Sequence, residues 1–560
     1  MKISEYESGP IRVRDGVLFS YWNPEANSVH IAGDFNGWDS VSHPMHRDVH
    51  GWWSATLPLE AGLHQYKFIV DNSWVLDPAN PCCIDNTLGG WNSFLEIAAD
   101  GEVHLEAPAE GMSAYSRFEA VDSPAWVNDA VIYEIFPRVF SQDGTLEAIR
   151  ARLPELASLG VNCIWLMPIH RIGTVGRKGI LGSPYAIYDY YSIDPGYGTA
   201  ADLRALVQTA HANGMRVIMD MVANHTANDC PLTKEHPDWY SRDGYGVIRS
   251  PGFGWDDVAQ LDYGSSELRD YMVEVMRYWV REFNIDGYRC DVAALVPLDF
   301  WKRVRAELRE IKQDIMLLAE SHEPAHNLHA FDLTYEESLP ALLSDVIRGV
   351  SPARSIREML ERQRLEFPRN SLRLRYLENH DQMRIQARLG DESGDEHAGR
   401  GGRLAAVLLL TLDGVPLIYN GQEIGERERP DLFDPFKIRW DRGDHELRGF
   451  YRDLLSIRRA SPALRRGDLK FIDIEYDDKC LAYVRQYTGN KGNEVGNEAG
   501  SAVLVALNFS GDRISFTVDL SGAVSEVFLN TGAYKLGTVL EPFSSQIIDL
   551  GAAFTLNKVS

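Results

Sequence analysis

The chain has 560 residues, and its 81 aspartates and glutamates outnumber its 56 lysines and arginines to give a formal net charge of −25. A chain of this length is too long for one hydrophobic core, so we expect roughly three or four domains. The acidic balance argues against a nucleic acid or an anionic membrane as partner, because both attract basic surfaces. No apolar run is long enough to cross a bilayer.

Two further features concern the compartment in which the protein works. The first residues, MKISEYESGPIRVRDG, contain no apolar segment of the kind that a secretory signal requires. The six cysteines show no metal-ligand spacing, which favours free thiols. We therefore expect a cytoplasmic protein, or a secreted one if a signal has been trimmed, and either a monomer or a homodimer.

Residues 1–100 consist of short apolar segments separated by turn residues, of which GWWSATLPL and HQYKFIV are the clearest. In the second, Tyr66, Phe68 and Val70 alternate with polar side chains, as in a strand with one buried face. Residues 1–100 are therefore predicted to form an N-terminal β-sandwich. The stretch rich in Ala, Glu and Gly that follows, residues 101–124, is predicted to be a linker.

Apolar strands alternate with amphipathic helices between residues 125 and 465. Helix 266–283 carries an apolar stripe, and Gly160 is placed to cap the end of helix 146–159. About eight such repeats predict a (β/α)8 TIM barrel, an α/β fold with its active site at the carboxyl ends of the strands. A doubly wound sheet is the alternative, but the chain has no G-x-G-x-x-G fingerprint. The clearest strands are VIYEIFP (131–137), VNCIWLMP (161–168), MRVIMDMV (215–222), IMLLAE (315–320) and VPLIYN (415–420).

Two further regions differ in pattern from the barrel. Residues 226–262 are polar and rich in glycine and aspartate, so they are predicted to be an inserted loop subdomain. Residues 466–560 return to short strands such as LAYVRQY and SEVFLN, which predict a C-terminal β-sandwich. Within it, residues 488–501 are of low complexity and are predicted to be disordered.

Polar residues close four of the predicted barrel strands, whose ends meet at one rim. A single carboxylate at such a place is more often a helix cap or an ion-pair partner, but four such strand ends are hard to explain by structure alone. A metal site is a rival interpretation, because the side chains that end the third strand could bind an ion. The residues are Asp220, Asn224 and His225 on the third strand, Arg289 and Asp291 on the fourth, Glu320 on the fifth, and Glu378, Asn379, His380 and Asp381 on the seventh.

Asp291 and Glu320 have contrasting predicted surroundings. Arg289 and Asp291 are two residues apart on a strand and point the same way, so the arginine is expected to lower the pKa of Asp291 and keep it ionised. Glu320 follows an apolar run, and apolar surroundings are expected to keep it protonated as an acid. Two carboxyl groups in contrasting environments are what glycosidic cleavage requires.

Four segments resemble the signature regions of the α-amylase family of glycoside hydrolases, family 13, and occur in the family's order. All four together, each at the end of a predicted strand, make a highly specific pattern. The stretch GSPYAIYDYYSIDPGYGT (182–199) also resembles the family's segment after the second strand, and the match covers roughly residues 125–560. The four segments are DMVANH (220–225), GYRCDVA (287–293), LLAES (317–321) and LENHDQ (377–382).

The resemblance implies a retaining hydrolase that cleaves α-1,4-glucosidic bonds in starch, glycogen, maltooligosaccharides or cyclodextrins through a covalent glycosyl-enzyme. Asp291 would be the nucleophile, Glu320 the proton donor, and Asp381 a third carboxylate that stabilises the transition state. No cofactor is implied for the chemistry, although Asn224 could bind a structural calcium. The implied substrate contacts are Tyr185, His225, Arg289, His380 and Arg384.

Residues beside the catalytic positions depart from familiar subgroups. Ala294 and Leu295 stand where many α-amylases carry Lys-His; cyclomaltodextrinases and neopullulanases share the preceding Asp-Val-Ala but also differ from this chain there. Ser321 stands where many relatives carry a bulky aromatic residue. A transglycosylase like the 4-α-glucanotransferases, which uses the same intermediate, is an alternative hypothesis, and a non-catalytic glucan-binding protein is a third.

Residues 28–97 separately resemble the glycogen-binding module of the AMP-activated kinase β subunit and of starch-debranching enzymes, a CBM48-like module. The matching segments are GDFNGW, HQYKF, a tryptophan followed by Asp-Pro, and LGGWNS. The alternative is a module that only supports the barrel. The implied glucan contacts are stacking by Trp38 and Trp74, hydrogen bonds from Lys67 and Asn92, and packing by Leu88.

Overall fold

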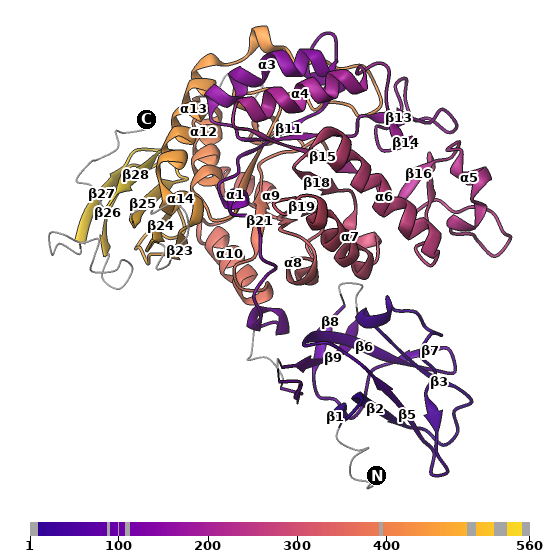
Figure 1. The fold of residues 1–560 in the computed structure, drawn as a ribbon. Helices are drawn as coiled ribbons and strands as arrows, with labels where there is room; N and C mark the ends of the chain where they lie inside the picture. Colours follow the sequence, from indigo (N-terminus) through magenta and orange to yellow (C-terminus); the bar gives the residue numbers. More distant parts are fainter. Residues whose placement is uncertain are drawn as a thin grey trace.

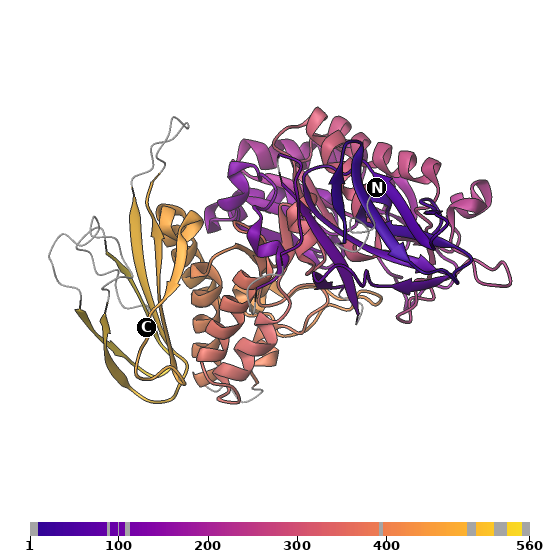
Figure 2. The ribbon, with the colours of Figure 1, turned by 90° about the horizontal axis from the view of Figure 1, so that it is seen from below.

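The chain forms a central barrel with strand-rich regions on two different sides of it (Figures 1 and 2). The predicted fold class, a (β/α)8 barrel with β-rich regions at both ends, is confirmed. No helix in the described part of the chain has the length and apolar character needed to cross a membrane. The computed structural model describes residues 9–86, 90–98, 100–106, 112–390, 396–489, 500–519 and 535–550.

The N-terminal region consists of two antiparallel sheets packed face to face. Tyr66 and Phe68 are fully buried between them, and Val70 packs against the same core, as the alternation predicts. The sheets continue into the predicted linker, because Gly101 turns the chain and Val103 pairs with Ile97. One sheet contains β1 (Ile11–Val13), β2 (Gly16–Trp22), β5 (Trp52–Leu57) and β4 (His46–Arg47); the other contains β10 (Val103–His104), β9 (Trp91–Ile97), β6 (Gly62–Val70) and β3 (Val29–Gly33), with β7 (Ser73–Val75) beside β6 and β8 (Cys83–Asp85) beside β9.

The N-terminal region rests against the barrel through a small apolar cluster. Leu63 and Phe94 of the module pack with Tyr115, which lies in the short helix η3 (Ala114–Arg117) of the predicted linker. Ala325 and Leu328 of the barrel pack against this cluster. Figure 1 shows the module below helices α7 (Leu298–Ile311) and α8 (Pro324–His329).

The barrel is a closed ring of eight parallel strands. Side chains from these strands fill its interior, so the ring is a packed core and not a pore. The carboxyl ends of all eight strands consequently meet at one rim. In spatial order the strands are β11 (Ile132–Ile135), β12 (Cys163–Leu166), β15 (Arg216–Met221), β18 (Gly287–Cys290), β19 (Met316–Ala319), β20 (Leu333–Tyr335), β21 (Leu372–Arg375) and β22 (Val415–Tyr419).

Helices surround the ring, and their ends follow local sequence signals. Helix α3 (Leu146–Leu159) starts at Thr145, whose side chain accepts from the Ala148 N–H, and it ends at Gly160 with φ 112°, as predicted. Helix α6 (Ser266–Phe283) has the predicted bounds. The remaining helices are α1 (Ala125–Asn128), α2 (Pro137–Phe140), α4 (Ala200–Ala212), α5 (Leu232–Glu235), α9 (Leu339–Ile347), α10 (Arg354–Glu366), α11 (Ile385–Arg388), α12 (Glu396–Thr411), α13 (His445–Ala460) and α14 (Pro462–Arg466).

Shorter strands lie outside the ring. Two hairpin-like pairs flank the rim, and the C-terminal region holds a four-stranded and a two-stranded sheet. The predicted strand SEVFLN and most of the predicted low-complexity segment 488–501 lie outside the described residues. The pairs are β13 (His170–Ile172) with β14 (Ile187–Ile193) and β16 (His225–Ala227) with β17 (Val258–Gln260); the C-terminal strands are β23 (Asp468–Phe471), β24 (Cys480–Tyr487), β25 (Ser501–Asn508), β28 (Ser545–Asp549), β26 (Ile514–Asp519) and β27 (Lys535–Leu540).

Candidate active site

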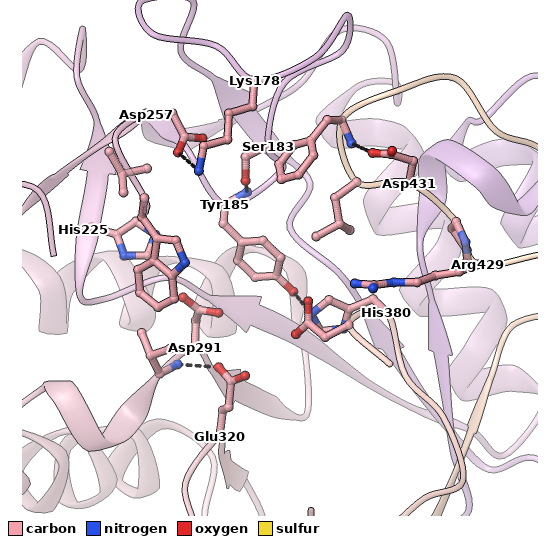
Figure 3. A pocket seen from close by; sticks show the side chains of 17 residues that line it. Lys178, Ser183, Tyr185, His225, Asp257, Asp291, Glu320, His380, Arg429 and Asp431 are labelled. Carbon is pink, nitrogen blue, oxygen red and sulfur yellow. Dashed lines mark hydrogen bonds and ion pairs between the residues drawn. The ribbon is translucent and has the colours of Figure 1, made fainter. Parts of the chain in front are cut away.

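A pocket of about 470 Å³ opens at the carboxyl ends of the barrel strands (Figure 3). Most of the residues predicted for the active site line it, although they are far apart in the sequence. The rest of the lining comes mainly from three loops, residues 178–183, 255–258 and 429–433. The predicted residues that line the pocket are Tyr185, His225, Asp291, Glu320, His380 and Asp381.

Arg289 joins the carboxyl groups on the floor of the pocket. This arginine lies on β18, in register with Asp220 of the neighbouring β15, and is fully buried. Its Nη1 lies 2.8 Å from Asp291 Oδ1 and 2.9 Å from Asp220 Oδ1, while its Nη2 lies 2.8 Å from Glu320 Oε2. One guanidinium therefore holds both predicted catalytic carboxyl groups, and the predicted common direction of Arg289 and Asp291 agrees with this contact.

The electrostatics around Asp291 differ from the prediction. Burial raises the pKa of Asp291 well above its ordinary value; Arg289 opposes this rise, but the neighbouring carboxylates of Glu320 and Asp220 add to it. Burial likewise raises the pKa of Asp220 to about 6. The predicted lowering of the Asp291 pKa is therefore wrong, because burial and the two neighbouring carboxyl groups outweigh Arg289.

Glu320 lies in polar surroundings, contrary to the prediction. Besides Arg289, its carboxylate accepts the Val292 N–H at 2.7 Å. Val292 has a φ of 37°, which is rare for a β-branched residue and costs of order 1–3 kcal/mol of strain. The turn directly after Asp291 is thus held in a strained conformation that aims a backbone donor at the second carboxyl group.

His380 links the third carboxylate to the interior of the barrel. Its Nε2 lies 2.7 Å from the Tyr185 hydroxyl and 3.1 Å from Asp381 Oδ2, and its Nδ1 lies 2.6 Å from Glu134 Oε1. Burial alone would lower the pKa of His380, but Asp381 and Glu134 raise it well above its ordinary value. Burial would raise the pKa of Asp381, yet His380 holds it below its ordinary value. His380 is therefore a cation and Asp381 an anion at neutral pH.

Glu134 was missed in the sequence. It lies on β11, is fully buried, and its Oε2 has no hydrogen-bond partner in the described part of the structure. The sequence contains one signal for this role: Glu134 is the only charged residue in the predicted strand VIYEIFP, which is otherwise apolar apart from Tyr133.

His225 and Tyr185 form one wall of the pocket. Burial lowers the pKa of His225 to about 4, so its ring is neutral at pH 7 and can accept as well as donate a hydrogen bond. The Tyr185 ring stacks on His380 with 5.5 Å between centroids. Both side chains line the pocket, and their contacts to a sugar stay a prediction.

Arg384 does not line the pocket, so its predicted sugar contact is corrected. Its guanidinium is fully buried, 2.8 Å from Glu378 Oε1, and donates to the carbonyl oxygen of Asn420 at 3.0 Å. The ring of Tyr419 covers it, with 4.4 Å from Cζ to the centroid. These contacts place Arg384 behind the pocket, where it braces the loops that follow β21 and β22.

Asn224 is buried just after the end of β15, beside His225. Its carbonyl accepts the Leu261 N–H at 3.1 Å, and its side-chain amide lies 3.3 Å from His225 Nδ1. Calcium takes carboxylate oxygens, backbone carbonyl oxygens and the carbonyl oxygens of Asn and Gln. The described residues contain no group of three or more His, Cys, Asp or Glu side chains that could hold a metal. Calcium binding by Asn224 stays a prediction.

The N-terminal module brings together only part of its predicted glucan contacts. Trp38 lies beside Trp74 with 6.1 Å between ring centroids, and Trp74 is 46% exposed. Lys67 lies half-buried on the neighbouring strand β6. Asn92 is buried and donates its amide to Gln65 at 2.8 Å, and its predicted hydrogen bond to glucan stays a prediction. Leu88 lies outside the described residues.

Two family models match the chain in the regions that the site and the module occupy. Residues 116–247 and 253–448 match the model described as the catalytic domain of alpha amylase. Residues 17–104 match the model described as the glycogen recognition site of AMP-activated protein kinase.

Individual proteins resemble the chain over most of its length. An α-amylase of Haloarcula japonica, MalA, is 31% identical over 450 residues, which are 77% of this chain and 62% of that protein, so the chain spans less than two thirds of it. A cyclomaltodextrinase from a Bacillus species is 28% identical and covers 65% of this chain and 71% of its own length. The crystal structure of a maltogenic α-amylase, AmyB from Thermotoga neapolitana, has a TM-score of 0.64 at 34% identity and covers 76% of this chain and 96% of that one.

Proposed function

Because the chain belongs to the α-amylase family of glycoside hydrolases, we propose that its pocket hydrolyses α-1,4-glucosidic bonds with retention of configuration. The observation that carries the proposal is the contact of Arg289 with both Asp291 and Glu320. Retaining glycosidases need two carboxyl groups close together, one as nucleophile and one as acid. The substrates are starch, glycogen, maltooligosaccharides or cyclodextrins, and relatives include proteins named for such activities.

In the first step Asp291 attacks the anomeric carbon while the bond from that carbon to the leaving oxygen breaks. Glu320 gives its proton to the leaving oxygen, so the free sugar departs neutral and a glycosyl ester to Asp291 remains. In the second step Glu320 takes a proton from water, and the resulting hydroxide displaces Asp291. Two inversions restore the original configuration.

The other groups position the sugar and stabilise charge. Asp381 is kept ionised by His380 and faces the pocket, so it suits a group that binds sugar hydroxyls and stabilises positive charge at the anomeric carbon. Arg289 holds Asp291 in place and supplies the charge that favours its ionised form. His225 and Tyr185 provide a hydrogen-bonding group and a stacking ring for the same sugar.

Hydrolysis is favoured over the other two hypotheses. The relatives named above are an α-amylase, a cyclomaltodextrinase and a maltogenic α-amylase, none of which is named as a transferase. A non-catalytic protein would have no need to keep three carboxyl groups in one pocket. For the module, we propose that Trp38 and Trp74 stack on α-glucan. The two rings lie side by side, Trp38 half-buried and Trp74 exposed, and the match to a glycogen recognition site also supports this.

The proposal is tested by a time course of products from starch, a cyclodextrin, pullulan and maltotriose. We expect shortened products from α-1,4 substrates and none longer than the substrate. Asp291→Asn should lower kcat by at least about 10⁴-fold because the nucleophile is lost. Circular dichroism should show an unchanged fold, and substantial turnover by a folded variant would contradict the assignment.

A further inference from the structure

Three loops from different β/α units meet on one side of the pocket. We call them the collar: residues 174–183 between β13 and β14, residues 254–258, which lead into the first residue of β17, and residues 429–434 after β22. Each loop lines the pocket with at least one side chain. Since the loops follow different barrel strands, their contacts with one another decide how far this side of the pocket is closed.

Lys178 fastens two of the loops together. Its Nζ lies 3.0 Å from Asp257 Oδ1 and donates to the carbonyl oxygen of Gly254 at 2.7 Å. The Asp257 side chain is only 6% exposed, so water screens this ion pair weakly. The ring of Phe433 in the third loop lies 5.9 Å from the same ammonium.

Hydrogen bonds of the backbone and of two side chains fasten the third loop to the first. Leu181 donates its N–H to the Phe433 carbonyl oxygen at 2.7 Å, and Ile180 donates to Asp434 Oδ1 at 2.9 Å. Arg138 donates to the carbonyl oxygens of Gly182 and Leu432 at 2.8 and 3.0 Å. The collar is therefore one connected wall and not three separate loops.

The collar lies on the side of the pocket away from the proton donor Glu320. Figure 3 shows Lys178 and Asp257 on one side of Tyr185 and Glu320 on the other. Glu320 must reach the glycosidic oxygen, so the leaving part of the substrate lies on the Glu320 side. In the proposed mechanism the sugar bound to Asp291 stacks on Tyr185, which lies between Glu320 and the collar, so the sugars before it extend towards the collar. The pocket volume of about 470 Å³ lies within the range of about 300–1,000 Å³ that is usual for small-molecule sites.

We propose that the collar closes the donor side of the pocket, so that the protein takes the non-reducing end of an α-glucan and releases a short product. Lys178 and Phe433 determine this specificity by holding the wall shut. The inference rests on the proposed hydrolase activity and adds the position in the chain at which cleavage occurs.

The test compares two forms of 4-nitrophenyl α-maltoheptaoside, one with a free non-reducing end and one with that end blocked by a 4,6-O-ethylidene group. Products are separated by chromatography, so that cleavage at any bond is counted. We expect the native protein to cleave the free chain and to cleave the blocked chain at least about 100-fold more slowly, because the blocked sugar cannot enter a closed pocket.

The double variant Lys178→Ala/Phe433→Ala should open the wall and reduce that ratio by at least about tenfold. Lys479→Ala is the matched control, because it removes a lysine that pairs with Asp512 at 2.8 Å on the C-terminal sheets, far from the pocket in sequence and fold. This control should leave the ratio unchanged. Thermal unfolding of each variant checks that the fold is retained.

The outcomes separate the two proposals. Comparable rates on both chains would overturn the closed donor side and leave the hydrolase activity intact. An unchanged ratio in a folded double variant would overturn the role of Lys178 and Phe433. Failure to cleave either chain would instead contradict the proposed function itself.

Discussion

At the scale of single residues, Glu134 has a role that its sequence position conceals. Glu134 does not line the pocket. Its Oε1 lies 2.6 Å from His380 Nδ1, and His380 Nε2 lies 3.1 Å from Asp381 Oδ2. Asp220 also acts on His380 through its charge, and the Tyr185 hydroxyl contacts the same ring. Glu134 is thus a positioning residue that acts through a histidine.

We expect Glu134→Gln to lower kcat/KM by about 10- to 100-fold, as for a charged hydrogen bond worth about 1.5–3 kcal/mol. Glu134 raises the pKa of His380, so its loss lowers that pKa, and the histidine loses its proton at a lower pH. The alkaline limb of the pH profile of kcat/KM should therefore move to lower pH.

Glu423→Gln is the matched control for this measurement. Glu423 is equally buried and accepts a hydrogen bond from the Tyr133 hydroxyl at 2.8 Å, but it does not line the pocket. Its variant should keep the native pH profile. An identical alkaline limb in Glu134→Gln would show that Glu134 only fills space.

The sequence predicted which carboxyl groups meet but not how each is surrounded. Asp291 and Glu320 could be located because strands of a parallel barrel end at one rim. The hydrogen bond from the Val292 N–H could not be predicted, because it depends on one strained turn. The burial of Arg384 could not be predicted either, because it depends on contacts with Glu378, Asn420 and Tyr419.

At the scale of elements, the end of α3 shows how a local signal and a tertiary contact coincide. Gly160 has a φ of 112°, and a Cβ added there would lie 2.7 Å from Leu455 Cβ of α13. The sequence predicted the cap, but only the structure shows the neighbouring helix. Conversely, β10 was not predicted, because a two-residue strand has too few residues to show alternation.

Gly160→Ala should destabilise the fold by more than Gly214→Ala does. Both glycines have positive φ, which costs an alanine roughly 1–2 kcal/mol, but nothing lies within 4 Å of a Cβ at Gly214. Overpacking against Leu455 should add about 1–3 kcal/mol to the effect at Gly160. Urea unfolding measures both free energies, and equal losses would mean that α13 yields without strain.

At the scale of the whole molecule, the proposed function assigns glycogen binding to the module and bond cleavage to the barrel, through different residues. Trp38→Ala/Trp74→Ala should weaken retention on glycogen by at least about tenfold, since each stacked ring contributes about 0.5–1.5 kcal/mol beyond its buried area. Cleavage of maltotriose should be unchanged, because the pair does not line the pocket. Affinity electrophoresis in glycogen gels gives the measurement.

Trp22→Ala is the control for that pair. Trp22 is also exposed, at 57%, but it lies on β2 in the other sheet of the module. It should leave retention on glycogen unchanged. If the double variant behaves like Trp22→Ala, the module has no glucan site at Trp38 and Trp74.

The N-terminal module is seated on the segment that carries the proton donor. Ala325 and Leu328 of α8 pack against the apolar cluster of the module, and α8 follows Glu320 after a short turn. Excising the module would leave this cluster in water, where apolar patches promote aggregation, and would loosen the start of α8. A chain without the N-terminal module should give less soluble protein and should turn over both small and large substrates more slowly. A chimera made from two relatives would consequently have to take the module and the α8 segment of the barrel from the same parent.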